Sequence, residues 1–432
     1  MLYYELTPVS KHFIWLWGGF LLCCGVGIQK KKGRTTMLSL DKVFNAQMVL
    51  KNIIRETNVV RAYGIAPECE LYLKPENLQI TGSFKVRGSA YKIAMLSEEE
   101  KERGVIACSA GNHAQGVALA ATKNGIKSLI CLPDTAPISK VEATKGFGAD
   151  VCLVEGCYDD AYQRAIELRD SEGYTFVHPF DDENVIAGQG TIALEILSDL
   201  DNIDAIVVPI GGGGLISGIA YTAKQIRPSI KIYGVQAAGA PSMYNSIKDG
   251  EIECLPSVST IADGIAVKQP GDNTFALVRD YVDEIALVTD DEISSAILAL
   301  IEKQKMIAEG AGATAVAAVM AGKFDLRGKR VVAVVSGGNI DVTSLSRVID
   351  RGLRNSGRSS SMLIELLDKP GQLKEISSII ADCGANVTGV HYEKGNTESV
   401  NGCFLRVEME TRNFDHLHAI TKRLRDEGFK II

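Results

Sequence analysis

Residues 205–220 read AIVVPIGGGGLISGIA, and this stretch decides how the chain is expected to fold. An apolar run leads into four consecutive glycines, and an apolar helical pattern follows them. The run predicts a fully buried strand, because it offers no polar side chain to water. Strand, tight loop and helix together form the repeating unit of an α/β protein.

The same alternation recurs from about residue 66 onward. Apolar runs predict further strands at residues 71–73, 104–108, 128–132, 150–154, 203–209, 231–235, 284–288 and 330–335. Helical periodicity separates them, for example over residues 114–123, 158–172 and 188–200. Strands that are apolar throughout and separated by helices form parallel sheets covered on both faces. Their number predicts more than one such sheet.

The composition changes near residues 351–361 (RGLRNSGRSSS), a polar and basic stretch that predicts a linker. A second alternation follows the linker. It predicts strands at 362–367, 386–394 and 400–410, helices at 372–384 and 414–428, and a short final strand at 430–432. This βαββαβ order predicts a separate small domain with two helices on one face of its sheet.

The bulk composition excludes some functions. The 432 residues are 46% hydrophobic and 23% charged, as expected for a folded protein with large cores. A net charge of -7 without a basic stripe argues against a nucleic-acid partner. Ten cysteines are scattered without a CxxC pair. We interpret them as reduced, mostly buried thiols and expect a cytoplasmic protein.

The first 36 residues do not match the rest of the chain. Residues 13–28 (FIWLWGGFLLCCGVGI) are a continuous apolar run, and three lysines at 30–32 follow it. The run is shorter than the roughly 20 residues of a membrane span, and a signal peptide carries its positive charge before the run. We therefore expect a leader outside the fold and no membrane partner, with a genuine anchor as the alternative.

The glycines at 211–214 have a chemical use. Their backbone N–H groups can converge, and the following helix adds a positive dipole end, so the loop suits a phosphate. The dinucleotide signature GxGxxG does not fit, because its last position falls on Ile216 or Ser217. A tight strand-to-helix turn without a ligand is the alternative.

A lone lysine occurs in LQITGSFKVRG at residues 78–88. Lys85 follows a hydroxyl- and glycine-rich segment (81–83) that predicts a helix cap, and a helical run comes after it. A helix N-terminus and partial burial both lower the pKa of a lysine amine. A lysine neutralised in this way is a candidate Schiff-base nucleophile. The alternative is a solvated residue in a turn.

Two further stretches place polar groups after a predicted strand. In CSAGNHAQG (108–116), polar side chains and backbone amides at a helix start suit a carboxylate; a helix cap with His113 packed nearby is the alternative. In VVAVVSGGN (331–339), Ser336 stands at a strand end. A lysine, a phosphate loop, a carboxylate site and a strand-end serine together match the needs of a pyridoxal phosphate enzyme that acts on an amino acid.

The motifs TGSFKVRG, SAGNHAQG, GGGGL and SGGN, in this order and spacing, resemble those of the fold-type II pyridoxal-phosphate enzymes, specifically the threonine/serine dehydratases. The resemblance covers roughly residues 40–355. It implies a tryptophan synthase β-like fold with two parallel-sheet subdomains, within a catalytic domain at 37–355 whose smaller subdomain is at about 88–187. It also implies pyridoxal 5'-phosphate as the cofactor.

The resemblance implies a role for each motif residue. Lys85 would bind the cofactor as a Schiff base and later move the substrate's α-proton, with Phe84 beside the pyridine ring. Asn112 would bond to the ring's phenolic oxygen and Ser336 to its nitrogen, and Glu309 would lie nearby without an assigned role. The remaining predicted contacts are Gly211, Gly212, Gly213, Gly214 and Leu215 for the cofactor and its phosphate, and Ser109, Ala110, Gly111 and His113 for the substrate.

Departures from related sequences narrow the expected reaction. Ala110 stands where related serine racemases have a second hydroxyl, so racemisation is expected to be weak. Gln236 and Ser242 stand near the position of those relatives' acidic metal ligands, so no metal is predicted. Val86 stands where β-replacing relatives have aspartate, which favours elimination.

The tail resembles the ACT regulatory domain in LLDKPGQL (366–373) and GANV (384–387). Residues 356–432 are therefore expected to bind an amino-acid effector, isoleucine by analogy, with valine or none as alternatives. Because only one unit is present, a homodimer or homotetramer is expected. A Pro-Gly turn without a ligand is the plainer alternative.

The expected reaction is β-elimination from L-threonine to 2-oxobutanoate and ammonia, and from L-serine to pyruvate, under allosteric regulation. A serine dehydratase or serine racemase is one alternative. A non-catalytic amino-acid sensor is the other, and the intact lysine and glycine motifs argue against it.

Overall fold

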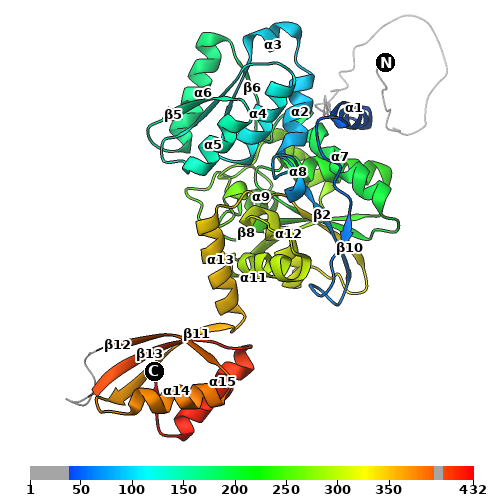
Figure 1. Ribbon diagram of the computed structural model, residues 1–432. Helices are drawn as coiled ribbons and strands as arrows, with labels where there is room; N and C mark the ends of the chain where they lie inside the picture. Colours follow the sequence, from blue (N-terminus) through cyan, green and yellow to red (C-terminus); the bar gives the residue numbers. More distant parts are fainter. Residues whose placement is uncertain (1–37, 394–401) are drawn as a thin grey trace, which may run out of the picture. The chain divides into compact units, whose positions relative to one another are not determined.

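The computed structural model describes residues 38–393 and 402–432. The described chain forms three sheets (Figure 1), two of them built mainly from parallel strands and the third antiparallel. This is the α/β class predicted from the apolar runs. The predicted leader at residues 1–36 lies outside the described residues.

The larger sheet has six strands in the order β1-β2-β10-β7-β8-β9. Its strands are β1 (Val60–Arg61), β2 (Glu70–Pro75), β7 (Ala205–Pro209), β8 (Lys231–Ala237), β9 (Glu284–Val288) and β10 (Arg330–Val335). Every neighbouring pair is parallel except β1 with β2. The apolar runs predict each strand except β1, whose two residues are both exposed and so lack the apolar signal.

Helices cover both faces of this sheet, as the continuous apolar runs require. Along β10, Val331 and Ala333 belong to the same buried cluster as residues of α11 and α12, whereas Val332 and Val334 pack with residues of α7 and α8. The helices of this part are α1 (Leu40–Leu50), α7 (Glu183–Asp199), α8 (Gly214–Ile226), α9 (Ser242–Asp249), α10 (Asp272–Tyr281), α11 (Asp290–Ala299), α12 (Gly310–Met320) and α13 (Val342–Asn355). Single turns occur at η1 (Glu76–Leu78), η2 (Asp263–Ile265) and η3 (Leu300–Gln304).

The second sheet has four parallel strands in the order β5-β4-β3-β6. Its strands are β3 (Val105–Cys108), β4 (Ser128–Pro133), β5 (Asp150–Val154) and β6 (Thr175–Phe176), and its helices are α2 (Lys85–Ala94), α3 (Glu98–Arg103), α4 (Asn112–Lys123), α5 (Ile138–Gly146) and α6 (Tyr158–Glu172). Ile106 packs with α6, whereas Ala107 packs with α4, so this sheet is also covered on both faces. The two-residue strand β6 is too short for a sequence pattern to predict.

The loops after β3, β7 and β10 carry the predicted site motifs. Ser109 directly follows β3, Ser336 directly follows β10, and Gly211 lies two residues beyond the end of β7. In parallel sheets the carboxyl ends of neighbouring strands share one edge, which is where α/β proteins bind ligands. The fold therefore places the glycine loop and the Ser336 loop side by side.

The tail forms the predicted βαββαβ unit. Its elements are β11 (Ser359–Leu367), α14 (Gln372–Asp382), β12 (Asn386–Glu393), β13 (Gly402–Glu410), α15 (Phe414–Asp426) and β14 (Lys430–Ile431), and its antiparallel sheet has the order β12-β13-β11-β14. Ile364 of β11 and Leu405 of β13 pack in one buried cluster with Ile376 of α14 and Ile420 of α15. Both helices thus cover one face of the sheet, as predicted (Figure 1).

The predicted linker at residues 351–361 is wrong for most of its length. Helix α13 continues to Asn355, and β11 already begins at Ser359. Arg351 pairs with Asp291 of α11 at 2.6 Å, and Ser359 is in register with Glu410 of β13. Most residues of this stretch therefore belong to a helix or a strand, and some of its polar side chains, such as Arg351, bond to neighbouring elements.

The cysteines are less buried than predicted. The eight described cysteines are free thiols, but Cys157 and Cys254 are exposed. No described helix is long and apolar enough to cross a lipid bilayer.

Candidate active site

Lys85 is the first residue of α2, so the predicted helix start is confirmed. The predicted hydroxyl or glycine cap is wrong, because Phe84 occupies the cap position and makes no side-chain capping bond. The Phe84 N–H instead donates to the carbonyl of Ser336 at 3.0 Å, and Ser83 forms a β-bridge with Gly337. The chain before Lys85 is therefore held by the loop after β10 rather than by a local cap.

The Lys85 side chain is partly buried, and its amine bonds to the fold. Its Nζ donates to the carbonyl of Pro179 at 2.7 Å and lies 5.3 Å from the centre of the Phe84 ring. Burial lowers the pKa of Lys85 to about 8, although Glu309 acts in the opposite direction. A sizeable fraction of the amine is thus neutral near physiological pH, which favours a nucleophile over a solvated turn residue.

The glycine loop is closely packed and ends in a helix N-terminus. Gly213 has a φ of +99°, a left-handed conformation, and a Cβ at that position would lie 2.7 Å from Thr274 Cβ. A side chain at Gly212 would overlap the Phe180 ring. The first N–H groups of α8 have no partner within their own helix. The loop thus offers backbone donors to an anion at a point that no larger residue could occupy.

Asn112 joins the remaining motifs in one hydrogen-bonded chain. Its Nδ2 donates to Glu309 Oε1 at 2.6 Å, and its Oδ1 accepts from Asn339 Nδ2 at 2.7 Å. Asn339 also donates to the carbonyl of Thr81 at 2.7 Å. The start of α4, the loop after β10 and the segment before Lys85 therefore meet at Asn112.

Glu309 is the ionisable partner in this chain. It is buried at the start of α12, and burial raises its pKa to about 7, with a further contribution from Asp263. The hydrogen bond from Asn112 and the charge of Lys85 act in the opposite direction. Its carboxyl group is therefore poised between the neutral and the charged form near pH 7.

The strand-end serine is buried with its hydroxyl pointing toward α12. Ser336 Oγ donates to the carbonyl of Ala311 at 3.3 Å, and its residue is only 3% exposed. Nearby, the Ser83 hydroxyl is fully buried and has no hydrogen-bond partner among the described residues. An unpaired buried hydroxyl beside Lys85 is unusual and fits a site that takes a polar ligand.

The loop predicted to bind the substrate joins β3 to α4, and the side chain of its histidine bonds within the protein. Ser109 Oγ accepts from the Gly111 N–H at 3.2 Å, and Ala110 is half-buried beside it. His113 Nε2 bonds to the carbonyl of Val177 at 2.8 Å, and burial lowers the pKa of His113 to about 3. The imidazole is thus a neutral, packed group, and only the backbone amide of His113 remains for the predicted substrate contact.

Leu215 likewise packs its side chain into the core around α8. Only its backbone N–H, in the first turn of α8, remains for the predicted contact with the cofactor.

Sequence reasoning missed four residues that the structure brings to the site. Asn339 is the last residue of the SGGN motif, so a motif could have indicated it as a site residue. Its hydrogen bond to Asn112 appears only in the structure. Pro179 and Phe180 lie in a segment without a recognisable pattern, although they contact Lys85 and the glycine loop. Ser83 belongs to TGSFK, but nothing in the sequence shows that its hydroxyl is unpaired.

The predicted absence of a metal stays a prediction. Among the described residues no group of three or more His, Cys, Asp or Glu side chains could hold a metal ion. Gln236 accepts from the Tyr244 N–H at 2.7 Å, and Ser242 donates to the carbonyl of Val267 at 2.8 Å. Ser242 and the side-chain oxygen of Gln236 are therefore bonded within the protein, whereas Gln236 Nε2 has no partner among the described residues.

The donor set fits pyridoxal phosphate. Lys85 offers an amine of lowered pKa for the aldehyde, and the Gly211–Gly214 loop offers backbone donors for the phosphate. Ser336 and the unpaired Ser83 each offer a neutral hydroxyl group. The glycine loop and the lowered pKa of the Lys85 amine are the two features that fit this cofactor best.

Comparison with known proteins agrees with this geometry. Residues 50–337 match the family described as pyridoxal-phosphate dependent enzyme. An L-threonine ammonia-lyase of Thermotoga maritima is 47% identical over 399 residues, which is 91% of this chain and 99% of that protein. The processed form of threonine deaminase isoform 2 from Solanum lycopersicum is similar in structure, with a TM-score of 0.69 at 38% identity over 72% of this chain and 94% of the other. Maize serine racemase also has a TM-score of 0.69, at 35% identity over 73% and 98%.

The chain therefore belongs to the family of pyridoxal-phosphate dependent enzymes, with the fold-type II architecture predicted from its motifs. It is an enzyme, and pyridoxal 5'-phosphate is its cofactor.

Proposed function

We propose that this enzyme converts L-threonine to 2-oxobutanoate and ammonia, and L-serine to pyruvate and ammonia. The observation that carries the proposal is the meeting of Lys85, Asn112 and Ser336, which come from three distant parts of the sequence. Phe84 bonds to the loop of Ser336, and Asn112 bonds to Asn339 of the same loop. The similarity to an L-threonine ammonia-lyase and to a threonine deaminase supports threonine as the substrate.

Lys85 and the glycine loop have separate roles in the proposed reaction. Bound pyridoxal phosphate supplies an electron sink for the negative charge that develops at the substrate's α-carbon. Lys85 would hold the cofactor's aldehyde group through Nζ in the resting enzyme, and the same Nζ would accept the substrate's α-proton during the reaction. The Gly211–Gly214 loop and the first turn of α8 hold the phosphate.

Two neutral groups direct the reaction toward elimination. Ser336 would offer a hydroxyl to the cofactor's pyridine nitrogen, and a hydroxyl, unlike a carboxylate, would not enforce protonation of that nitrogen. The negative charge would then be less widely delocalised, which would favour rapid loss of the β-hydroxyl over transamination. Glu309 and Asn339 fix the Asn112 amide from both ends, and the second N–H of its Nδ2 would donate to the cofactor's phenolic oxygen.

A comparison of the wild-type enzyme with Lys85→Ala tests the proposal. The wild type is expected to form 2-oxobutanoate from L-threonine and to show the visible absorbance of the lysine-bound cofactor. Lys85→Ala is expected to lose both. Lys123→Ala, which removes an exposed lysine of α4, is the matched control and should keep both. Equal rates of 2-oxoacid formation in the wild type and in Lys85→Ala would contradict the proposed role of Lys85.

A serine racemase is the second candidate, because maize serine racemase shares this fold at 35% identity. Ala110 offers no hydroxyl that could protonate the opposite face of the substrate, so D-serine formation should be slow. Relative rates of 2-oxoacid formation from L-threonine and L-serine and of D-serine formation separate the two. Faster D-serine formation than pyruvate formation would favour the racemase.

The division into domains and the regulation are part of the proposal. Residues 37–355 would form the catalytic domain, with a smaller subdomain at about 88–187, and residues 356–432 an ACT-like domain that binds an amino-acid effector such as isoleucine. The separate buried core of the tail supports this division. A homodimer or homotetramer in the cytoplasm, without a nucleic-acid partner, completes the proposal.

A further inference from the structure

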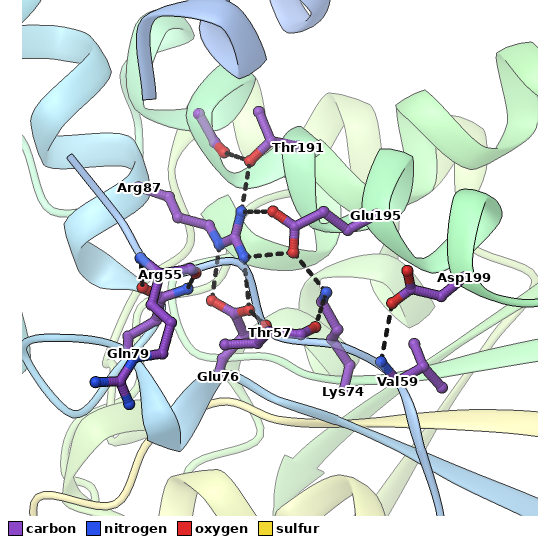
Figure 2. Close-up of polar contacts among 11 residues, drawn as sticks. Arg55, Thr57, Val59, Lys74, Glu76, Gln79, Arg87, Thr191, Glu195 and Asp199 are labelled. Carbon is purple, nitrogen blue, oxygen red and sulfur yellow. Dashed lines mark hydrogen bonds and ion pairs between the residues drawn. The ribbon is translucent and has the colours of Figure 1, made fainter. Parts of the chain in front are cut away.

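The first turn of α2 contributes one residue to a buried cluster of four charged side chains that the proposed reaction does not use. Lys74, Glu76, Arg87 and Glu195 form it, and no side chain of the four is more than 7% exposed. Figure 2 shows that the four side chains point toward one another. The two cations balance the two carboxylates, and Arg87 lies only two residues after Lys85.

Arg87 uses every donor that it has. Nε and Nη2 donate to Glu76 at 2.8 Å each, and Nη1 and Nη2 donate to Glu195 at 2.6 and 2.8 Å. The fifth N–H, on Nη1, donates to Thr191 Oγ1 at 3.1 Å. A guanidinium group has five N–H donors in a rigid plane, so this arrangement fixes both its position and its rotation.

The carboxylates are equally well satisfied. Glu195 Oε2 also accepts from Lys74 Nζ at 2.5 Å, and Glu76 Oε1 also accepts from the Thr57 hydroxyl. Burial alone would raise the pKa of Glu195, but hydrogen bonds and charges from Arg87 and Lys74 lower it. Glu195 therefore keeps its charge in the folded protein.

Buried charge clusters of this kind contribute little to the free energy of folding. Removing two charge pairs from water is costly, and apolar residues of similar volume often stabilise a core equally well or better. What the cluster does provide is a fixed geometry among elements that are distant in sequence: Lys74 comes from β2, Glu76 from η1 and Glu195 from α7. Arg87 connects all of them to the first turn of α2.

Glycine contacts hold the same turn on its other sides. A Cβ on Gly116 of α4 would lie 3.1 Å from the carbonyl carbon of Lys85, and one on Gly188 of α7 would lie 2.7 Å from the carbonyl oxygen of Arg87. Helices α4 and α7 thus approach the backbone of this turn directly. Toward β2 and η1, the Arg87 side chain makes the connection.

Helix α7 also connects this turn to the acceptor of the Lys85 amine. The chain runs from Pro179 into α7 within four residues, and Glu195 and Thr191 belong to the same helix. Fixing α2 against α7 therefore fixes Lys85 relative to Pro179.

We propose that Arg87, held by Glu76 and Glu195, is a positioning residue that sets the first turn of α2 so that the Lys85 amine stays at its place beside Pro179. The inference rests on the proposed role of Lys85 as the cofactor-binding lysine. Arg87 does not touch substrate or cofactor in this account and acts only through the backbone that it shares with Lys85.

Arg87→Lys tests the proposal, because it keeps the charge but cannot form both forked pairs. The first readout uses the cofactor-free full-length chain and follows acetylation of Lys85 by acetic anhydride against pH, with peptide mass spectrometry. The titratable groups that face Lys85 are Glu309, His113 and His178, and the variant leaves all three unchanged. The second readout is kcat and KM for L-threonine in the holoenzyme.

The expected result is a displaced lysine. The acetylation midpoint of the wild type should lie near pH 8 and should move upward in Arg87→Lys, because a loosened turn exposes the amine to water. The value of kcat should fall about 100-fold, as expected for a misplacement of about 1 Å, with a smaller change in KM. Thr191→Val, which removes a single neutral acceptor, should show smaller changes in the same direction and decides the question if Arg87→Lys does not fold.

Ile93→Ala is the matched control, because it creates a cavity in the buried part of α2 away from the charge cluster. It should lower the melting temperature and leave both the midpoint and kcat near their wild-type values. The inference would be overturned by wild-type values in folded Arg87→Lys, or in folded Thr191→Val if only that variant folds. It would also be overturned if Ile93→Ala changed both readouts as strongly. Full activity of Lys85→Ala would instead overturn the proposed function, and this inference with it.

Discussion

Glu309 and Lys85 are two ionisable groups whose ordinary protonation states the fold changes in opposite ways. Burial raises the pKa of the carboxyl group to about 7 and lowers the pKa of the amine to about 8. Both groups can therefore exchange protons near neutral pH, and Asn112 bonds directly to one of them. A site that must release and recover protons during an elimination benefits from two such groups.

The raised pKa of Glu309 predicts a pH-dependent stability for the cofactor-free chain. The folded state holds this proton up to about pH 7, whereas the ordinary pKa of a glutamate in an unfolded chain is 4.5. The stabilisation is fully present below pH 4.5 and is lost as the pH rises to 7. Glu309→Gln cannot lose a proton, so above pH 7 it should be more stable than the wild type by up to about 3 kcal/mol.

Urea unfolding of the two proteins between pH 4.5 and 8 measures this difference. The two stabilities should converge toward the acidic end of the range and diverge toward neutral pH. A constant difference over the whole range would show that Glu309 does not titrate there.

The motifs of the candidate site could be recognised in the sequence, and the partners of their side chains could not. Lys85, Asn112 and Ser336 stand in such motifs, and hydrogen bonds connect the segments that carry them. The use of His113 as a packed core residue depends on Val177 and Ser89, which no local pattern connects to it. The buried Arg87 is hidden in the same way, because its partners Glu76 and Glu195 lie 11 and 108 residues away in sequence.

At the scale of elements, two glycines allow α2 and α7 to cross at backbone distance. A Cβ on Gly188 would lie 2.7 Å from Gly88 Cα as well as from the carbonyl of Arg87. Gly88 in turn has no room for a Cβ beside the Val185 carbonyl, at 2.7 Å. Helix α2 therefore packs against α7 more closely than it could if either Gly88 or Gly188 carried a side chain.

Gly188→Ala tests this crossing through the sign of its effect. Helix propensity alone predicts stabilisation by about 1 kcal/mol, because glycine is unfavourable inside a helix. The crossing predicts the opposite, a destabilisation of about 1–3 kcal/mol from overpacking. Urea unfolding should show the loss. Gly146→Ala in α5, where a Cβ would meet nothing within 4 Å, is the control and should be neutral or stabilising. A stabilised Gly188→Ala would contradict the close crossing.

Element boundaries show where sequence patterns succeed and fail. The apolar runs of β7 and β10 predict these strands, because strands buried on both faces need apolar residues throughout. The stretch at 351–361 predicts a linker, yet α13 and β11 occupy most of it, since polar side chains there find partners such as Asp291. Composition alone does not show whether a polar residue faces water or a partner in another element.

At the scale of the whole molecule, we propose that catalysis and regulation belong to separate parts of the chain. The solved threonine deaminase and serine racemase cover 72% and 73% of this chain but 94% and 98% of their own. Structures of this kind are therefore nearly complete without a quarter of the present chain. A protein of residues 37–355 should keep the kcat of the full chain and should lose any response to isoleucine or valine.

Assays of 2-oxobutanoate formation with and without these amino acids check this prediction. Loss of all activity in a folded truncated protein, or an unchanged response to isoleucine, would contradict the proposed division.

The proposed reaction depends on Lys85 as the residue that holds the cofactor. Borohydride reduction of the holoenzyme fixes the cofactor permanently to its lysine, and peptide mass spectrometry then locates it. We predict a single pyridoxyl group on Lys85, in the peptide that contains TGSFK. A pyridoxyl group on any other lysine, with Lys85 unmodified, would contradict the account.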